Sequence, residues 1–149
     1  MNHQAVNARQ IKILLVEDSA GDVRLTQEAL RDSKLCNRLH VVNDGVAALA
    51  FLRQQPPYQD APRPDVILLD LNLPKKGGHE VLAEVKSDPA LRRIPIIILT
   101  TSSAEEDILK TYDLHANCYI TKPLDFSKFT EIVHNIENFW FSIVRLPPS

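Results

Sequence analysis

The sequence contains little of what marks several large classes of protein. It has two cysteines, four glycines and one tryptophan among 149 residues. Cys36 and Cys118 form no CxxC pair and have no histidine nearby at the spacing of a metal site. We therefore expect two reduced, semi-buried thiols with no metal or redox role.

Charge of one sign and long apolar runs are also missing. The 17 basic and 19 acidic residues are scattered along the chain, and the formal net charge is −2. This pattern offers no basic surface to nucleic acid or to an anionic membrane. No apolar run approaches the ~20 residues that span a bilayer, and residues 1–10 lack the apolar core of a signal peptide. These absences favour a cytoplasmic protein that binds neither membrane nor nucleic acid.

What the chain does have is a regular alternation of short apolar runs and amphipathic stretches. Apolar runs predict strands, and apolar residues at helical spacing predict helices, of which one carries Val23 and Leu25 and the next Val46, Leu49 and Leu52. Residues 54–65 contain four prolines and are expected to form a loop. The predicted strands are Ile11–Val16, Leu39–Val42, Val66–Asp70, Ile96–Thr100 and Cys118–Thr121, and the predicted helices are Ala20–Asp32, Asp44–Arg53, Gly78–Ser87, Ala104–Leu114 and Phe126–Phe141.

Five strand–helix repeats predict an α/β fold, a parallel sheet with helices on both faces. The first, third and fourth runs are continuously apolar, as expected for central strands that are buried on both faces. We expect one domain over residues 11–141, an N-terminal tail over 1–10 and a C-terminal tail over 142–149.

Polar residues follow four of these strands at the point where each strand ends. Glu17 and Asp18 follow the first strand, Asp70 ends the third, Thr100 ends the fourth and Lys122 follows the fifth. Each has a structural explanation when it is taken alone, since acids favour helix N-termini and Ser19 could cap the first helix. Ligand sites of open parallel sheets lie beyond the carboxyl ends of the strands. Together, the four strand ends predict one polar cleft.

The residue types in this cleft suit phosphoryl transfer. Three carboxylates that lie close together repel one another unless a cation lies among them, and all-oxygen ligands favour Mg²⁺. The carboxylate of Asp70 can attack phosphorus to give an acyl phosphate. Lys122 and Thr100 would then neutralise and bind the transferred oxygens.

The motifs "ED" after the first strand, "LLDLNLP", the Thr that ends the fourth strand and "KP" after the fifth resemble the receiver domain of two-component response regulators, over about residues 12–136. The resemblance implies a doubly wound, five-stranded, flavodoxin-like sheet of order 2-1-3-4-5. It also implies a phosphoacceptor that catalyses only its own phosphorylation and dephosphorylation, and is otherwise not an enzyme.

The resemblance assigns a role to each residue of the cleft. Asp70 would be the phosphoacceptor, and Thr100 and Lys122 would contact the phosphoryl oxygens. Tyr119 would be the switch aromatic whose rotamer follows Thr100, and the Lys122–Pro123 bond would be cis. Mg²⁺ would be held by Glu17, Asp18, Asp70 and the backbone carbonyl of Asn72.

Two positions depart from the family pattern and bear on how long a phosphoryl group lasts. Lys76, Gly77 and Gly78 stand where family members often have Met-Asp-Gly, so that Lys75 and Lys76 flank the site. Thr101 is bulkier than the small residue usual after the Thr. Both changes are expected to alter the access of phosphodonor or water.

A narrower resemblance is to the single-domain regulators of cyanobacterial phytochromes. It rests on the proline-rich loop, "LNLPKKGG", "NCYITKP" and the tail "NFWFSIVRLPP". It implies a light-sensing histidine kinase as phosphodonor. Since the sequence shows no DNA-binding segment, we expect output through a downstream protein partner or a change of oligomeric state. We also expect a homodimer through the helix over 104–114, the strand over 118–121 and the last helix, in which Phe139, Trp140 and Phe141 widen the apolar surface.

Other functions fit these residues less well. An Asp-nucleophile phosphatase needs an acid two residues after the nucleophile, where this chain has Asn72. A flavin binder needs a hydroxyl- and glycine-rich loop after the first strand, where "EDSAGD" places three acids. The alternatives that stay open are a phosphate-independent docking module and a relay intermediate that passes its phosphoryl group to a histidine phosphotransfer protein.

Overall fold

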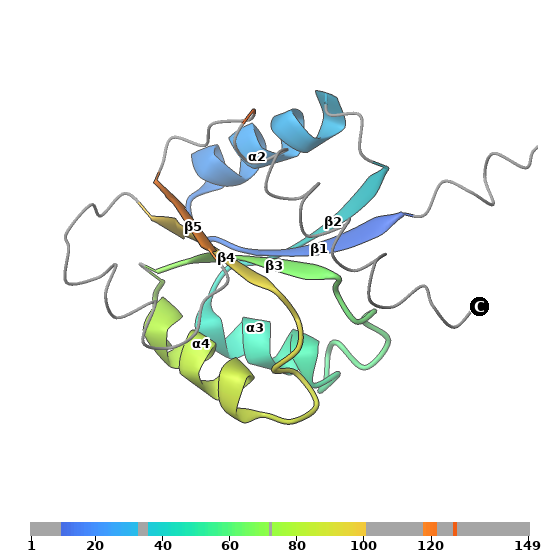
Figure 1. Cartoon of the computed structure of the whole chain (residues 1–149), viewed down its shortest axis with the longest axis vertical. Coiled ribbons are helices and arrows are strands. Elements are labelled where there is room, and N and C mark those ends of the chain that lie inside the picture. The colour runs from blue at the N-terminus through green and yellow to red at the C-terminus, as the bar shows by residue number, and fades with distance from the viewer. Residues whose placement is uncertain (1–9, 33–35, 72, 101–117, 122–126, 128–149) are drawn as a thin grey trace, which may run out of the picture.

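A computed structural model describes residues 10–32, 36–71, 73–100, 118–121 and 127 (Figure 1). Within these ranges, no helix combines the length and the apolar character needed to cross a bilayer. The elements in chain order are β1 (Ile11–Val16), α2 (Ala20–Asp32), β2 (Asn37–Val42), α3 (Gly45–Leu52), β3 (Val66–Asp70), α4 (Gly78–Ser87), β4 (Ile96–Thr100) and β5 (Cys118–Thr121).

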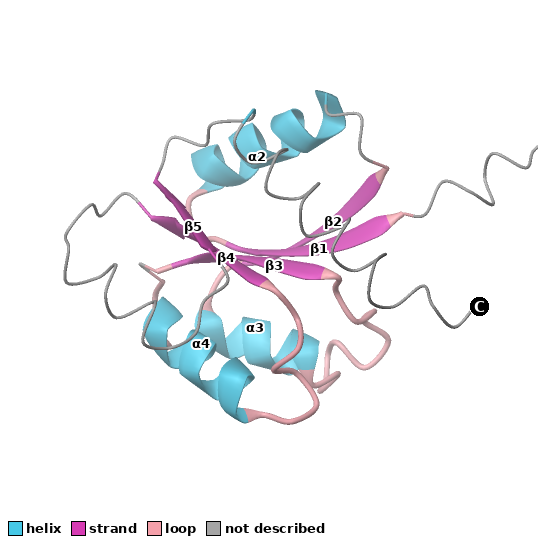
Figure 2. Cartoon of the chain, in the orientation of Figure 1, coloured by secondary structure: helices cyan, strands magenta, loops and turns pink. Residues whose placement is uncertain are grey.

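The five strands form one parallel sheet. Their order is β2-β1-β3-β4-β5, and every neighbouring pair is parallel. Helix α2 covers one face of the sheet, and α3 and α4 cover the other (Figures 1 and 2). The predicted fold class and strand order are therefore confirmed. The carboxyl ends of the strands lie at one edge, where this topology places ligand sites.

Alternate residues of each central strand build the two halves of the core. Leu14 and Val16 of β1 pack on the side of α3 and α4, whereas Ile13 and Leu15 pack on the side of α2. All five residues of β3 are buried, including its last residue, Asp70. Because both faces of the strand are covered, its apolar run is continuous rather than alternating.

Six elements begin and end where the sequence predicts. Strand β2 differs, because it begins at Asn37, two residues before the apolar run. Asn37 and Arg38 pair with Ile11 and Lys12 at the edge of the sheet, where polar side chains reach solvent. Cys36, directly before this edge strand, is exposed, and the expectation of a semi-buried thiol there was wrong. Asp44 and Arg53 are the caps of α3 rather than its ends.

Two apolar residues assigned to helix patterns are exposed. Val46 is 52% exposed and Leu25 is 53% exposed. Residues three apart in a helix are offset by about 60° around its axis, so the row 46, 49 and 52 spreads over about 120°. Leu49 and Leu52 lie on the buried side of α3, and Val46 falls beyond its border. In α2, Thr26 is buried and the neighbouring Leu25 is not.

The predicted helices over 104–114 and 126–141 lie outside the described residues, apart from Ser127. So does the tail over 142–149, and so does all of the tail over 1–10 except Gln10.

Candidate functional site

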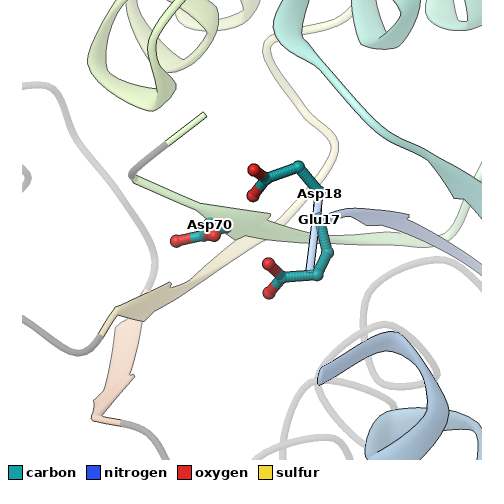
Figure 3. A group of neighbouring side chains, drawn as sticks. All are labelled: Glu17, Asp18 and Asp70. Carbon is teal, nitrogen blue, oxygen red and sulfur yellow. The ribbon is translucent and has the colours of Figure 1, made fainter. Parts of the chain in front are cut away.

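Three carboxylates meet at the carboxyl edge of the sheet. Glu17 and Asp18 directly follow β1, and Asp70 ends the neighbouring β3. The register pairs Val16 with Leu69, which places the next residues of both strands side by side. One carboxylate oxygen of each residue lies within 4.8 Å of the other two. Figure 3 shows Glu17 and Asp18 leaving the end of β1 in opposite directions, with Asp70 beside them.

The burial of these groups makes their proximity costly without a cation. Glu17 is 1% exposed and Asp70 is 4% exposed, whereas Asp18 is exposed to solvent. Buried carboxylates that lie this close repel one another, and a cation among them removes the repulsion. A set of carboxylate oxygens open to solvent on one side suits a hard divalent ion that keeps part of its water shell. The site therefore fits a divalent metal.

The main chain at Glu17 is held from several directions. Its N–H donates to the carbonyl of Val42 at 3.0 Å, and its own carbonyl accepts from the side-chain amide of Asn43 at 3.0 Å. Its carboxylate accepts from the N–H of Ser19 at 3.2 Å. The hydroxyl of Ser19 in turn accepts from the N–H of Asp22 at 3.2 Å, which confirms Ser19 as a cap of α2.

Asp70 is supported from behind by a glycine that the sequence reasoning did not single out for this role. A Cβ at Gly78 would lie 2.6 Å from the carbonyl oxygen of Asp70 and 2.6 Å from the Cα of Leu71. The N–H of Gly78 donates to the carbonyl of Leu71 at 3.1 Å. The start of α4 thus packs directly on the main chain of the predicted phosphoacceptor, and only a residue without a side chain fits there.

The two lysines after Asp70 are engaged by neighbouring acids. The ammonium of Lys76 donates to a carboxylate oxygen of Glu84 on α4, and Arg53 pairs with the same carboxylate at 3.5 Å. The hydrogen bond from Lys76 is the main cause that lowers the pKa of Glu84. Lys75, whose φ is 65°, lies 3.5 Å from the carboxylate of Asp44. Each lysine thus ties the loop after β3 to another part of the fold.

The remaining predicted site residues are described only in part or not at all. Thr100 is the last residue of β4, the strand beside β3, and Tyr119 lies in β5 opposite Ile98. The side chains of Thr100 and Tyr119 lie outside the described structure. The same is true of Asn72, Lys122, Pro123, Thr101 and the aromatic residues Phe139, Trp140 and Phe141.

Comparison with known proteins agrees with this geometry. The model of the response regulator receiver domain matches residues 13–134. The chain belongs to this receiver family. Response regulator Rcp1 of Synechocystis sp. is 53% identical over 135 residues, which cover 91% of this chain and 92% of Rcp1.

Two solved structures of receivers are similar along nearly the whole chain. The Mn²⁺-bound form of Rcp1 has a TM-score of 0.75 at 52% identity and covers 92% of this chain and 99% of its own. The structure of the phosphorylated cyanobacterial phytochrome response regulator RcpA has a TM-score of 0.77 at 55% identity. The match covers 93% of this chain and 99% of the RcpA chain. This receiver therefore shares its fold with proteins solved in a metal-bound and in a phosphorylated state.

Proposed function

We propose that this receiver takes a phosphoryl group on Asp70 from the phosphohistidine of a sensor kinase and changes its surface in response. The observation that carries this proposal is the meeting of Asp70 with Glu17 and Asp18 at the carboxyl edge of the sheet, within 4.8 Å of one another. A carboxylate that is buried, backed by the main chain of α4 and adjoined by two further acids is poised for chemistry that needs a cation.

The transfer is a single displacement at phosphorus. A carboxylate oxygen of Asp70 forms the new P–O bond while the P–N bond to the kinase histidine breaks, and the bonding electron pair returns to the imidazole nitrogen. The product is an acyl phosphate on Asp70. A divalent cation at the carboxylates, Mg²⁺ in the cell, would offset the negative charge that gathers on the phosphoryl oxygens.

The residues of this chain divide the remaining tasks. Glu17, Asp18, Asp70 and the backbone carbonyl of Asn72 would hold the cation. Thr100 and Lys122 would bind the phosphoryl oxygens, and Tyr119 would report the position of Thr100 to the surface. Lys122 supplies a fixed positive charge, so its removal is expected to uncouple phosphorylation from the surface change while metal binding is retained.

The relatives suggest the pathway. RcpA is a cyanobacterial phytochrome response regulator, and its identity of 55% over nearly all of both chains supports a phytochrome histidine kinase as the phosphodonor here. Output would pass through a protein partner, in the cytoplasm. It would involve a homodimer formed through the helix over 104–114, the strand over 118–121 and the aromatic residues Phe139, Trp140 and Phe141.

Phosphorylation by a small-molecule donor tests the proposal. The protein is incubated with acetyl phosphate and Mg²⁺, and its intact mass is measured. Wild type should gain one phosphoryl group, and Asp70→Asn should gain none. Asp60→Asn, a change of an exposed aspartate in the loop before β3, is the matched control and should behave as wild type. Labelling of Asp70→Asn to the level of wild type would refute the assignment.

The metal and the dimer are tested separately. Asp18→Asn should weaken Mg²⁺ binding sharply, because it removes the carboxylate that is open to solvent. Phe139→Glu and Trp140→Glu should shift sedimentation toward monomer, since each places a charge in the proposed interface. Unchanged association of both variants would exclude this interface.

A further inference from the structure

The turn between β2 and α3 contributes no carboxylate to the cluster of Glu17, Asp18 and Asp70, yet it touches both chain segments that carry the cluster. Asn43 donates its side-chain amide to the carbonyl of Glu17 at 3.0 Å, across a separation of 26 residues. The next residue, Asp44, pairs with Lys75 in the loop that follows Asp70. In the sheet, β1 lies between β2 and β3, so the turn reaches over the end of β1 from one neighbour to the other.

The carbonyl that Asn43 binds belongs to the peptide group joining Glu17 to Asp18. This peptide group is flanked by the ψ torsion of Glu17 and the φ torsion of Asp18, and a change in either torsion alone moves Asp18 relative to the end of β1. Glu17 is buried and its carboxylate accepts from the N–H of Ser19, so it has constraints of its own. Asp18 is exposed, and packing therefore does little to fix it. The fold therefore constrains Asp18 through its main chain, and the Glu17–Asp18 peptide is the group that Asn43 holds.

Asn43 is itself exposed, so its amide can act as an anchor only if the turn is rigid. Two contacts make it so. The carboxylate of Asp44 accepts from the N–H of Ala47 at 2.7 Å and caps α3. Gly45 lies so close to the loop after β3 that a Cβ on it would be 2.2 Å from the carbonyl oxygen of Lys76. The backbone on the C-terminal side of Asn43 is thus fixed against α3 and against that loop.

The geometry points to Asn43 as a positioning residue of the metal site: its amide orients the Glu17–Asp18 peptide so that the Asp18 carboxylate faces the cation. This inference rests on the proposed function of the carboxylate cluster. Residues that hold metal ligands in place typically contribute 10–100-fold to metal affinity. Because Asn43 acts through the main chain, we expect the lower end, about 10-fold.

A matched control lies on β2, the strand that Asn43 directly follows. Asn37, at the other end of β2, donates its side-chain amide to the carbonyl of Leu30 at 3.1 Å, far from the carboxylates. Asn37→Ala and Asn43→Ala each remove a side-chain-to-main-chain hydrogen bond, and both should lower the urea midpoint. Only Asn43→Ala should change metal affinity.

The test is a Mn²⁺ titration of the full chain, followed by the electron paramagnetic resonance signal of the free ion. Asn43→Ala should raise the dissociation constant about 10-fold, and Asn37→Ala should leave it within about twofold. In phosphorylation by acetyl phosphate, Asn43→Ala should need more Mg²⁺ for half-maximal rate and should approach the wild-type rate at saturating Mg²⁺. If Asn43 had a purely structural role, saturating Mg²⁺ would not restore the rate of phosphorylation.

Asp18→Asn and Asp70→Asn separate failure of the inference from failure of the proposed function. If both lose Mn²⁺ affinity and Asn43→Ala does not, the positioning role is overturned and the metal site stands. An equal loss in Asn43→Ala and Asn37→Ala would also overturn it, because general destabilisation would explain both. If Asp18→Asn and Asp70→Asn bind Mn²⁺ as wild type does, the proposed metal site is wrong, and the inference falls with it.

Discussion

Two adjacent glycines at the start of α4 should respond in opposite directions to the same substitution. A Cβ on Gly78 would lie 2.6 Å from the carbonyl oxygen of Asp70 and 2.6 Å from the Cα of Leu71. Both are main-chain atoms and cannot swing aside as a flexible side chain would. Among the described residues, a Cβ on Gly77 would meet only the end of the Glu80 side chain, at 3.9 Å. Gly77 has φ −69° and ψ 162°, values that any residue adopts, and it stands at the N-cap without a side chain to cap the helix.

The magnitudes follow from these contacts. Forcing atoms into a packed site costs about 1–3 kcal/mol, and contact with main chain on two sides places Gly78→Ser at the upper end. The loss of unfolded-state freedom returns about 0.4–1 kcal/mol, so the net destabilisation should be about 2 kcal/mol. Gly77→Ser gains the same entropic term and supplies a preferred N-cap oxygen. It should stabilise the protein by about 0.5–1 kcal/mol.

Urea unfolding measures both changes. With a slope of about 2 kcal/mol per molar urea, Gly78→Ser should lower the midpoint by about 1 M, and Gly77→Ser should raise it by a few tenths. Phosphorylation of Gly78→Ser should also be slower than that of Gly77→Ser, because the displaced main chain carries Asp70. Equal midpoints for the two variants would refute the claim that α4 packs against the phosphoacceptor backbone.

Two further predictions concern titration and the lysine loop. His40 packs against Phe51, with ring centroids 5.5 Å apart. Burial is the main cause that lowers the pKa of His40, and the positive charges of Arg38 and Lys12 lower it further. The unfolded chain therefore takes up the proton first, so stability should be full above about pH 6.5 and fall as the pH drops below it. The urea midpoint of His40→Gln should change less between about pH 8 and pH 5 than that of wild type, and an identical change would contradict this. Lys76 donates to Glu84 on α4, so its charge is engaged there. Lys76→Met should leave the rate of phosphoryl loss within about twofold, measured by intact mass at timed intervals, and a much larger change would mean that its charge acts at Asp70.

Much of the fold could be predicted because the central strands are buried on both faces. The runs at Ile11–Val16 and Ile96–Thr100 are apolar apart from Lys12 and the final Thr100, and the strand bounds predicted from them match the structure. Strand β2 lies at the edge of the sheet, and its first residues, Asn37 and Arg38, carry no apolar signal. Val46 and Leu25 show a further limit, because spacing alone does not locate the border of a helix face.

The site could be predicted in part for a related reason. Glu17, Asp18 and Asp70 lie at the carboxyl ends of two neighbouring buried strands, so the topology alone brings them together. Residues that support the site from other segments give no comparable signal. Asn43 acts on a carbonyl 26 residues earlier in the chain, and Gly78 matters because of what lies against it. Such roles depend on three-dimensional packing, which no local pattern in the sequence records.

The most direct test of the account is to locate the phosphoryl group on the chain. Protein phosphorylated by a histidine kinase is reduced with sodium borohydride, which converts an aspartyl acyl phosphate to homoserine, and the peptides are then sequenced by mass spectrometry. The account predicts homoserine at position 70, with Asp18 and Asp65 unchanged. Homoserine at another aspartate, or phosphorylated protein with an unmodified Asp70, would contradict it.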